Sequence, residues 1–195
     1  LAAYNGYKEV SKVKDFVESF NCVRFPEDDM CIIYDEKSEI NEFLDQHHWI
    51  TQIQKPRESE NAYADRFKHF AETIRVSDHS QFICSDIRDV IFQRNPFYWL
   101  QNNCEKNVIV CDEGVPHNSP KGGIFTLNQV KDGFPDYEKS ILKKNVINVG
   151  VIGGDKRVGQ ICERVFDMCN GVEERIHHHG SYAFDQAAMG ILSHL

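Results

Sequence analysis

Short apolar runs alternate along this chain with longer segments of helical spacing, and this alternation limits the possible folds more than any other feature. The runs have the length of buried strands and lie at 1–3, 30–34, 50–54, 81–84, 107–111 and 146–152. Apolar residues recur at three- and four-residue steps in the segments at 8–20, 40–48, 59–74, 158–168 and 185–195. Strands joined by helices imply crossover connections and a mainly parallel sheet with helices on both faces. We therefore predict the α/β class.

Two local features refine this prediction. Ser38 stands directly before the helical segment at 40–48, where a hydroxyl can cap the first turn, so we expect it to be the N-cap. The stretch from 114 to about 133 is polar and contains Gly122 and Gly123. It lacks the spacing of a phosphate-binding loop, and we expect it to be a long connection on the acceptor side.

Length and charge place the chain among ordinary globular domains. Its 195 residues correspond to one domain at 1–195. With 22 basic and 30 acidic side chains the formal charge is −8, which argues against a broad basic surface for nucleic acid or an anionic membrane. No run approaches the ~18 consecutive apolar residues of a membrane span, and no signal-peptide leader stands at the start. Because residue 1 is Leu rather than Met, we expect a fragment of a longer chain, in which an anchor can lie outside these residues.

Cysteine usage favours a reducing compartment. The chain has seven cysteines, an odd number that excludes a complete set of internal disulfides, and it contains no Cys-x-x-Cys pair. Cys31, Cys84 and Cys111 stand inside apolar runs, where cysteine acts as a small hydrophobic residue. We therefore predict a cytoplasmic domain.

Polar residues gather where four of the predicted strands end. These ends carry Asn5 and Gly6, Asp86 and Asp89, Asp112 and Glu113, and Asn148 and Gly150. Ligands of open α/β sheets bind outside the carboxyl ends of the strands, so this pattern indicates a site for a polar ligand or a metal. The alternative is that strand ends are solvated loops and therefore polar.

The segment after the strand at 81–84 carries the sharpest chemistry. Asp86 and Asp89 are separated by two residues, so both carboxylates can turn toward one point. Mg²⁺ and Mn²⁺ take oxygen ligands and are typically held by one or two carboxylates together with substrate phosphates. Arg88 lies between them, where it can neutralise the pair or bind a phosphate. A surface Asp-Arg-Asp turn is the alternative.

The run SDIRDVIFQRNPF at 85–97 resembles the acidic metal-binding signature of glycosyltransferases with the GT-A fold, which use nucleotide sugars. Four further blocks are similar to that family and follow in its order: AAYNG at 2–6, NAYADRFKHF at 61–70, INVGVIGGD at 147–155 and FDQAAMGIL at 184–192. The chain is also similar to the compact glycosyltransferase domains encoded by chlorella viruses. The resemblance implies a single Rossmann-like GT-A domain, and a viral origin would place it in the host cytoplasm.

The resemblance also implies roles for individual residues. It assigns donor binding to Ala3, Tyr4, Asn5, Asp35, Arg66, Asp86 and Arg88, the acceptor or sugar side to Asn148, Gly150 and Gly153, and catalysis to Asp185 and Gln186. It assigns the metal, Mn²⁺ or Mg²⁺, to Asp86 and Asp89, with His194 or His179 as a third ligand. The family signature is usually Asp-x-Asp, so the wider spacing here leaves open which aspartate binds the metal directly.

Several of these residues have plainer explanations. A ring at Tyr4 can stack on a pyrimidine base, but a tyrosine at a strand end is more often a packing residue. Asp35 can accept hydrogen bonds from the base or ribose, or simply begin a loop. Arg66 can reach a diphosphate or be a solvated arginine on a helix.

We predict an enzyme that moves a sugar from a nucleoside diphosphate sugar, most simply a UDP-sugar, to a hydroxyl of a glycan or protein-linked acceptor. The resemblance favours retention of the anomeric configuration. One alternative is a metal-dependent phosphohydrolase, but it would need an aspartate at the end of the first strand, where Tyr4, Asn5 and Gly6 stand. Another is a non-catalytic nucleotide-binding module of a larger protein.

Overall fold

The computed structural model describes residues 1–4, 9–57, 62–103, 108–121, 123–176 and 184–194. Its strands are β1 (Ala2–Tyr4), β2 (Met30–Tyr34), β3 (Ile50–Gln54), β4 (Phe82–Asp86), β5 (Val108–Pro116) and β6 (Asn145–Gly154). They form one six-stranded sheet in the order β3-β2-β1-β4-β6-β5. The first four strands are parallel, whereas β6 runs antiparallel to both β4 and β5. The predicted α/β class with a mainly parallel sheet is therefore confirmed, and the antiparallel strand β6 makes the sheet mixed.

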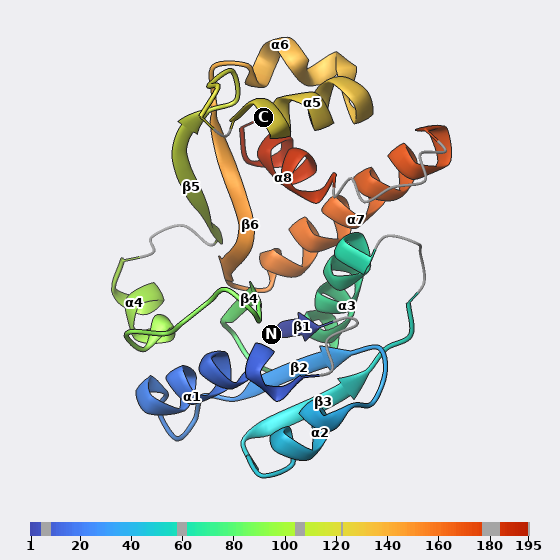
Figure 1. The fold of residues 1–195 in the computed structure, drawn as a ribbon. Coiled ribbons are helices and arrows are strands. Elements are labelled where there is room, and N and C mark those ends of the chain that lie inside the picture. Colours follow the sequence, from blue (N-terminus) through green and yellow to red (C-terminus); the bar gives the residue numbers. More distant parts are fainter. Residues whose placement is uncertain (5–8, 58–61, 104–107, 122, 177–183, 195) are drawn as a thin grey trace.

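Helices cover both faces of this sheet (Figure 1). They are α1 (Lys14–Val23), α2 (Glu39–Leu44), α3 (Ala62–Val76), α4 (Pro96–Asn103), α5 (Gly123–Gly133), α6 (Glu138–Ile141), α7 (Arg157–Ile176) and α8 (Asp185–His194), with short 3-10 turns at Val10–Lys12 and Pro135–Tyr137. No helix of the described residues is both long and apolar enough to cross a bilayer.

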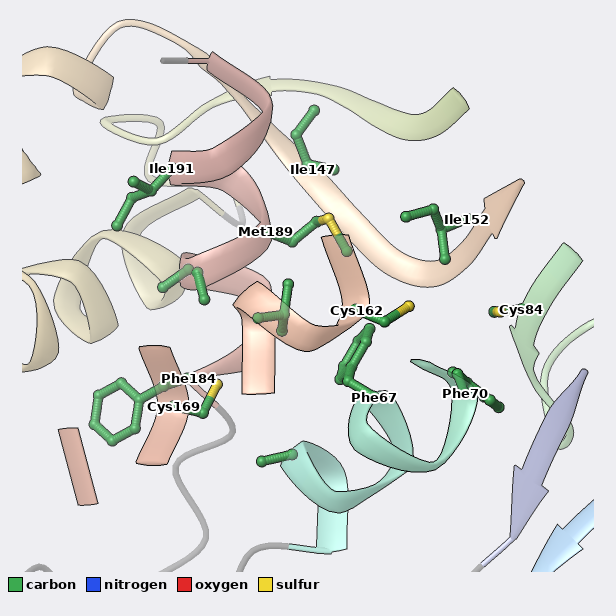
Figure 2. Packing of buried hydrophobic residues seen from close by; sticks show 14 of the residues in the cluster. Phe67, Phe70, Cys84, Ile147, Ile152, Cys162, Cys169, Phe184, Met189 and Ile191 are labelled. Atoms are coloured by element: carbon green, nitrogen blue, oxygen red, sulfur yellow. The ribbon is translucent and has the colours of Figure 1, made fainter. Parts of the chain in front are cut away.

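The apolar core consists of two clusters, one on each face of the sheet, and the side chains of β2 alternate between them. Ile32 and Tyr34 pack with α1 and α2 on one face, and Ile33 packs with α3, α7 and α8 on the other. Successive side chains of a strand point to opposite faces, so a run of five apolar residues serves both clusters. Figure 2 shows the larger cluster, in which Phe67 of α3, Cys162 of α7 and Met189 of α8 meet beneath the sheet.

The antiparallel direction of β6 determines what lies at the carboxyl edge of the sheet. Ser85 of β4 pairs with Val151 of β6, and Phe82 pairs with Gly154. The residues of β6 that precede Val151 therefore extend past the end of β4. This places Asn148 and Gly150 at the edge where Asp86 ends its strand.

Three helices were not predicted from the sequence. The stretch at 114–133, predicted to be a long connection, contains the end of β5 and all of α5. The buried side of α5 includes the polar residues Thr126 and Gln129, so the sequence lacks the regular spacing of apolar residues that would predict a helix. Helix α4 begins at Pro96 with Asn95 accepting a hydrogen bond from the amide of Tyr98 at 2.9 Å, and α6 has only four residues.

The cysteines are free thiols wherever the structure describes them, and they differ in environment. Cys84 is buried in the core as predicted, and Cys31 is half-buried. Cys111 is exposed, because it begins the exposed stretch of the edge strand β5 at residues 111–114, so it does not have the buried place that its apolar run indicated.

The predicted N-cap at Ser38 is confirmed. Its hydroxyl accepts from the amide of Ile40 at 3.3 Å, and its own amide donates to Asn41 Oδ1 at 2.8 Å. This reciprocal capping satisfies amides that the first turn of α2 leaves without an intrahelical acceptor.

We expect Ser38→Ala to lower the free energy of unfolding by about 1 kcal/mol, the usual cost of losing a capping side chain. Ser38→Asp should retain most of the stability, because aspartate is an equally good cap. Urea denaturation of the three proteins measures the difference, and equal midpoints for Ser38→Ala and the unchanged protein would contradict this role.

Candidate active site

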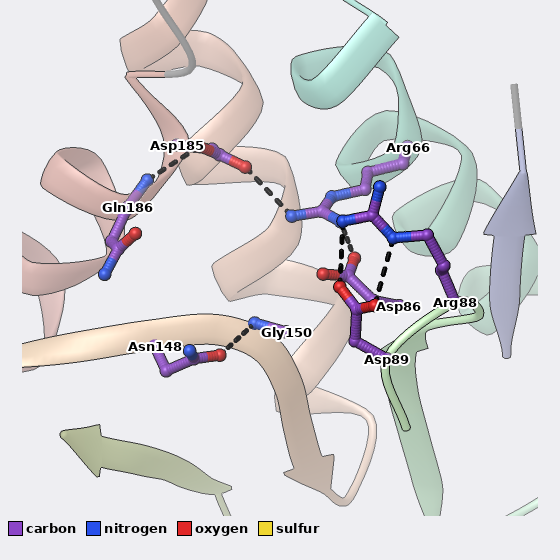
Figure 3. A network of polar contacts seen from close by, with 8 residues as sticks. All are labelled: Arg66, Asp86, Arg88, Asp89, Asn148, Gly150, Asp185 and Gln186. Carbon is purple, nitrogen blue, oxygen red and sulfur yellow. Dashed lines mark hydrogen bonds and ion pairs between the residues drawn. The ribbon is translucent and has the colours of Figure 1, made fainter. Parts of the chain in front are cut away.

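Arg66 of α3 joins two aspartates that lie far apart in sequence (Figure 3). Its Nη1 donates to Asp86 Oδ1 at the end of β4, and its Nη2 donates to Asp185 Oδ2 at the start of α8 over 2.9 Å. Of the predicted site residues, these three come from three separate blocks of the chain, and the structure brings them into direct contact.

The environment of Arg66 is not that of a solvated arginine. Its side chain is 12% exposed, and its guanidinium carbon lies 4.9 Å from the ring centroid of Phe67. The buried Nε atom has no hydrogen-bond partner among the described residues. An arginine this buried requires opposite charge nearby, and Asp86 and Asp185 supply it.

Asp185 is a buried carboxylate, with its side chain 4% exposed. Burial raises the pKa of Asp185 above the ordinary aspartate value, and the charge of Arg66 together with the backbone amide of Gln186 opposes that rise. The Gln186 amide donates to Asp185 Oδ1 at 2.9 Å. The start of a helix favours a negative charge, so α8 itself helps to hold the ionised form.

The loop after β4 holds a second ion pair. Arg88 Nε and Nη2 donate to the two oxygens of Asp89 at 3.0 and 2.9 Å. These bonds lower the pKa of Asp89 below its ordinary value. Each of the two predicted metal ligands is thus paired with an arginine, Asp86 with Arg66 and Asp89 with Arg88.

Strand β6 supplies the third side of the site. Asn148 Oδ1 accepts from the amide of Gly150 at 2.7 Å, and Asn148 Nδ2 donates to Glu113 Oε1 of β5 at 3.1 Å. A Cβ atom on Gly150 would lie 2.7 Å from Asn148 Oδ1 and 3.4 Å from Asp86 Oδ2, so any larger residue here would displace the side chain of Asn148. The sequence predicted that Asp112 and Glu113 follow the end of a strand, which was wrong, because β5 continues to Pro116. It did not select Glu113 as a site residue.

Three of the remaining predicted residues, Ala3, Tyr4 and Asp35, belong to β1 or follow β2. Ala3 pairs with Asp86 across the sheet, and Tyr4 pairs with Tyr34. Asp35 follows β2, where its Oδ2 accepts from Arg57 Nε at 2.9 Å. All three therefore lie at the carboxyl edge of the parallel strands.

Gly153 and His194 lie elsewhere. Gly153 pairs with Ile83 and Ile109 inside the sheet. His194 ends α8, nine residues after Asp185 and so about 13.5 Å farther along the helix axis. Its Nε2 lies 2.7 Å from the carbonyl oxygen of Asn145. Asn5 and His179 are outside the described residues, so their predicted roles stay predictions.

The donor atoms at Asp86 and Asp89 fit a hard divalent cation, because both residues offer carboxylate oxygens. No group of three or more His, Cys, Asp or Glu side chains within the described ranges is arranged to hold a metal. The two aspartates would therefore need oxygen ligands from phosphates and water, which is the usual ligand set of Mg²⁺ in phosphate-binding enzymes.

No protein-family model matches the chain, and no curated protein matches it. Solved structures do match the chain. The galactosyltransferase LgtC, in complex with donor and acceptor sugar analogues, superposes with a TM-score of 0.60 at 12% identity over 97% of this chain and 69% of LgtC. Mouse xyloside xylosyltransferase 1 gives 0.57 at 9% identity over 99% of this chain and 80% of that enzyme.

The bifunctional glycosyltransferase WbbM superposes with a TM-score of 0.55 at 10% identity. The match covers 98% of this chain but only 36% of WbbM. The chain therefore has the GT-A fold, and this prediction is confirmed. The proteins that it resembles in structure are glycosyltransferases. The resemblance to chlorella-virus domains stays a prediction.

We expect Arg66→Ala to lower the free energy of unfolding by about 3 kcal/mol at pH 8, because it leaves the carboxylate of Asp185 buried without its partner. Loss of Arg66 raises the pKa of Asp185 further. The folded protein then binds a proton at a pH where the unfolded chain does not, so the destabilisation grows with rising pH and shrinks in acid. Urea denaturation at pH 5 and pH 8 measures this difference.

Arg75→Ala is the matched control on the same helix. Arg75 pairs with Glu163 at 3.0 Å, but these side chains are 63% and 55% exposed, so its loss should cost no more than about 1 kcal/mol. Adding Asp185→Asn to Arg66→Ala should recover much of the lost stability at pH 8. Equal effects of the two arginine substitutions would show that Arg66 is an ordinary surface residue.

Proposed function

We propose that the chain is a metal-dependent glycosyltransferase that moves a sugar from a UDP-sugar to a hydroxyl of a glycan or protein-linked acceptor. The observation that carries this proposal is the contact of Arg66 with both Asp86 and Asp185. It joins a candidate metal ligand to a buried carboxylate at the carboxyl edge of a GT-A sheet, where ligands of such sheets bind.

The arginines have a second role once a donor binds. In the structure, Arg66 and Arg88 neutralise Asp86 and Asp89. If Asp86 and Asp89 turn to a divalent ion, both guanidinium groups become available for the diphosphate. Bonds from arginine to phosphate are charge-assisted and can be bidentate, so the exchange replaces each ion pair with another of similar strength.

The bound ion would supply charge neutralisation for the leaving diphosphate. Asp185 and Gln186 stand next to Arg66 at the start of α8, where they would orient the hydroxyls of the donor sugar. Asn148 and Gly150 on β6 would form the acceptor side. Ala3 and Tyr4 on β1 and Asp35 after β2 would bind the base and ribose, together with Asn5, which is outside the described residues. We propose retention of the anomeric configuration from the family resemblance.

We expect UDP to stabilise the protein only when Mn²⁺ or Mg²⁺ is present, because without the ion Arg66 and Arg88 stay paired with Asp86 and Asp89 and cannot bind the diphosphate. A ligand at 100 times its Kd adds about 2.7 kcal/mol to the free energy of unfolding. Asp89→Asn should remove most of this gain, as measured by scanning calorimetry with UDP and Mn²⁺. The ion without UDP should stabilise far less, since it must displace two arginines.

The chain contains a matched control for this experiment. Asp155 and Arg157 form an ion pair at 3.0 Å that resembles the pair of Asp89 and Arg88, but they follow β6 at the opposite edge of the sheet. Asp155→Asn should leave the stabilisation by UDP and Mn²⁺ intact. Equal stabilisation by UDP in excess chelator would refute the metal-dependent site.

Transfer itself is tested by incubating the protein with a panel of UDP-sugars and Mn²⁺ and measuring UDP release with and without simple sugar acceptors. Asp185→Asn should lower turnover by ~100-fold and change donor affinity by no more than a few-fold, as expected for a group that acts on the reacting sugar. Unchanged turnover in this variant would remove Asp185 from the chemistry. An unchanged protein that binds UDP and Mn²⁺ but releases no UDP would favour a non-catalytic nucleotide-binding module.

A further inference from the structure

Glu113 of β5 connects the two sides of the candidate site. Its Oε1 accepts from Gln186 Nε2 of α8 at 2.9 Å and from Asn148 Nδ2 of β6 at 3.1 Å. The three residues come from three elements, and Glu113 is separated from Gln186 by 73 positions. One carboxylate oxygen therefore ties the acceptor side on β6 to the start of α8.

The local backbone of β5 explains this placement. The pairing of β5 with β6 shifts register between Val110 and Cys111, and again between Asp112 and Pro116. Such irregularities bend a strand and redirect its side chains. The second shift brackets Glu113, which lies in the exposed part of β5 and reaches over β6 to α8.

The chemistry of Glu113 determines how both amides are oriented. An ionised carboxylate only accepts hydrogen bonds, so Gln186 and Asn148 must each present the nitrogen of their amide to it. The oxygen of Gln186 then points away from Glu113. Figure 3 shows this oxygen on the side of Gln186 that faces Arg66 and Asp86. The oxygen of Asn148 is used by the amide of Gly150.

We propose that Glu113 is a positioning residue, which fixes Gln186 so that its carbonyl oxygen, and not its NH₂ group, faces the donor sugar. This proposal rests on the proposed function for its substrate. A carbonyl oxygen accepts a hydrogen bond, so the site selects a sugar with a hydroxyl donor at that point. A donor lacking this hydroxyl would leave the oxygen unpaired.

The first experiment reads the two amides directly by NMR and needs no substrate. The side-chain NH₂ signals are assigned with Gln186→Leu and Asn148→Ala. In Glu113→Gln, the oxygen that accepts from both amides becomes neutral, and a hydrogen bond to a neutral acceptor is about half as strong as one to a carboxylate, so both contacts weaken. Both NH₂ signals should shift and exchange faster with water. Unchanged signals would overturn the proposal.

Asp112→Asn is the matched control. Asp112 is the neighbour of Glu113 on β5, and it also accepts from an amide side chain, that of Asn145 at 3.0 Å, and from the backbone amide of Gly114 at 2.6 Å. These partners lie outside the contacts of Gln186 and Asn148. Asp112→Asn should therefore leave both assigned NH₂ signals in place.

The second experiment separates positioning from mere structural support. In Glu113→Gln, kcat for UDP release should fall about tenfold, the effect of losing one hydrogen bond in the transition state, while the donor KM and the melting temperature stay near their original values. Adding Gln186→Glu reverses donor and acceptor across the contact and again presents an oxygen to the sugar, so it should recover part of kcat. An unchanged kcat in Glu113→Gln would overturn the positioning role.

The two experiments also distinguish this proposal from the proposed function. If the unchanged protein releases no UDP from any donor, the proposed function fails, and the NMR comparison still decides whether Glu113 fixes the two amides. If UDP is released normally and Glu113→Gln alters neither the NMR signals nor kcat, the proposed function stands and the role of Glu113 is refuted.

Discussion

The ion pairs of Arg66 are the constraint on which the candidate site depends. Asp185 is almost fully buried, and a buried carboxylate persists only with opposite charge and hydrogen bonds beside it. Arg66 supplies that charge from α3, and its contact with Asp86 connects the same network to β4. The start of α8 and the end of β4 are thus held in one arrangement by a side chain that belongs to neither element.

Packing in the core makes this arrangement possible. Helix α3 lies against α7, and α7 against α8, beneath the same face of the sheet (Figure 1). Gly159 of α7 lies so close to α3 that a Cβ there would come within 3.1 Å of Ile74. The close approach of these helices fixes the direction in which Arg66 leaves α3. The polar network therefore depends on an apolar contact about two turns farther along the same helix.

The sequence predicted the elements whose pattern is local. The strands at 30–34 and 50–54 have the predicted bounds because each is a short run flanked by turn residues, and Ser38 caps α2 because its role needs only the next three residues. Asp86, Arg66 and Asp185 were selected through motif resemblance, and their contact could not be predicted from spacing, since it requires α3 and α8 to meet the sheet at one point. Glu113 was missed because its position depends on register shifts in β5 that no local pattern reveals.

The antiparallel pairing of β6 with β4 and β5 determines where such a domain can tolerate insertions. The position of Asn148 and Gly150 beside Asp86 is set by the pairing of β4 with β6, and not by the length of the chain that joins β5 to β6. A slip of one residue would turn every side chain of β6 to the opposite face, so this register resists change. Insertions in the joining segment, where α5 and α6 lie, cost little by comparison, because loop entropy grows slowly with length. The sequence and length of that segment can therefore change while Asp86, Asn148 and Gly150 keep their arrangement.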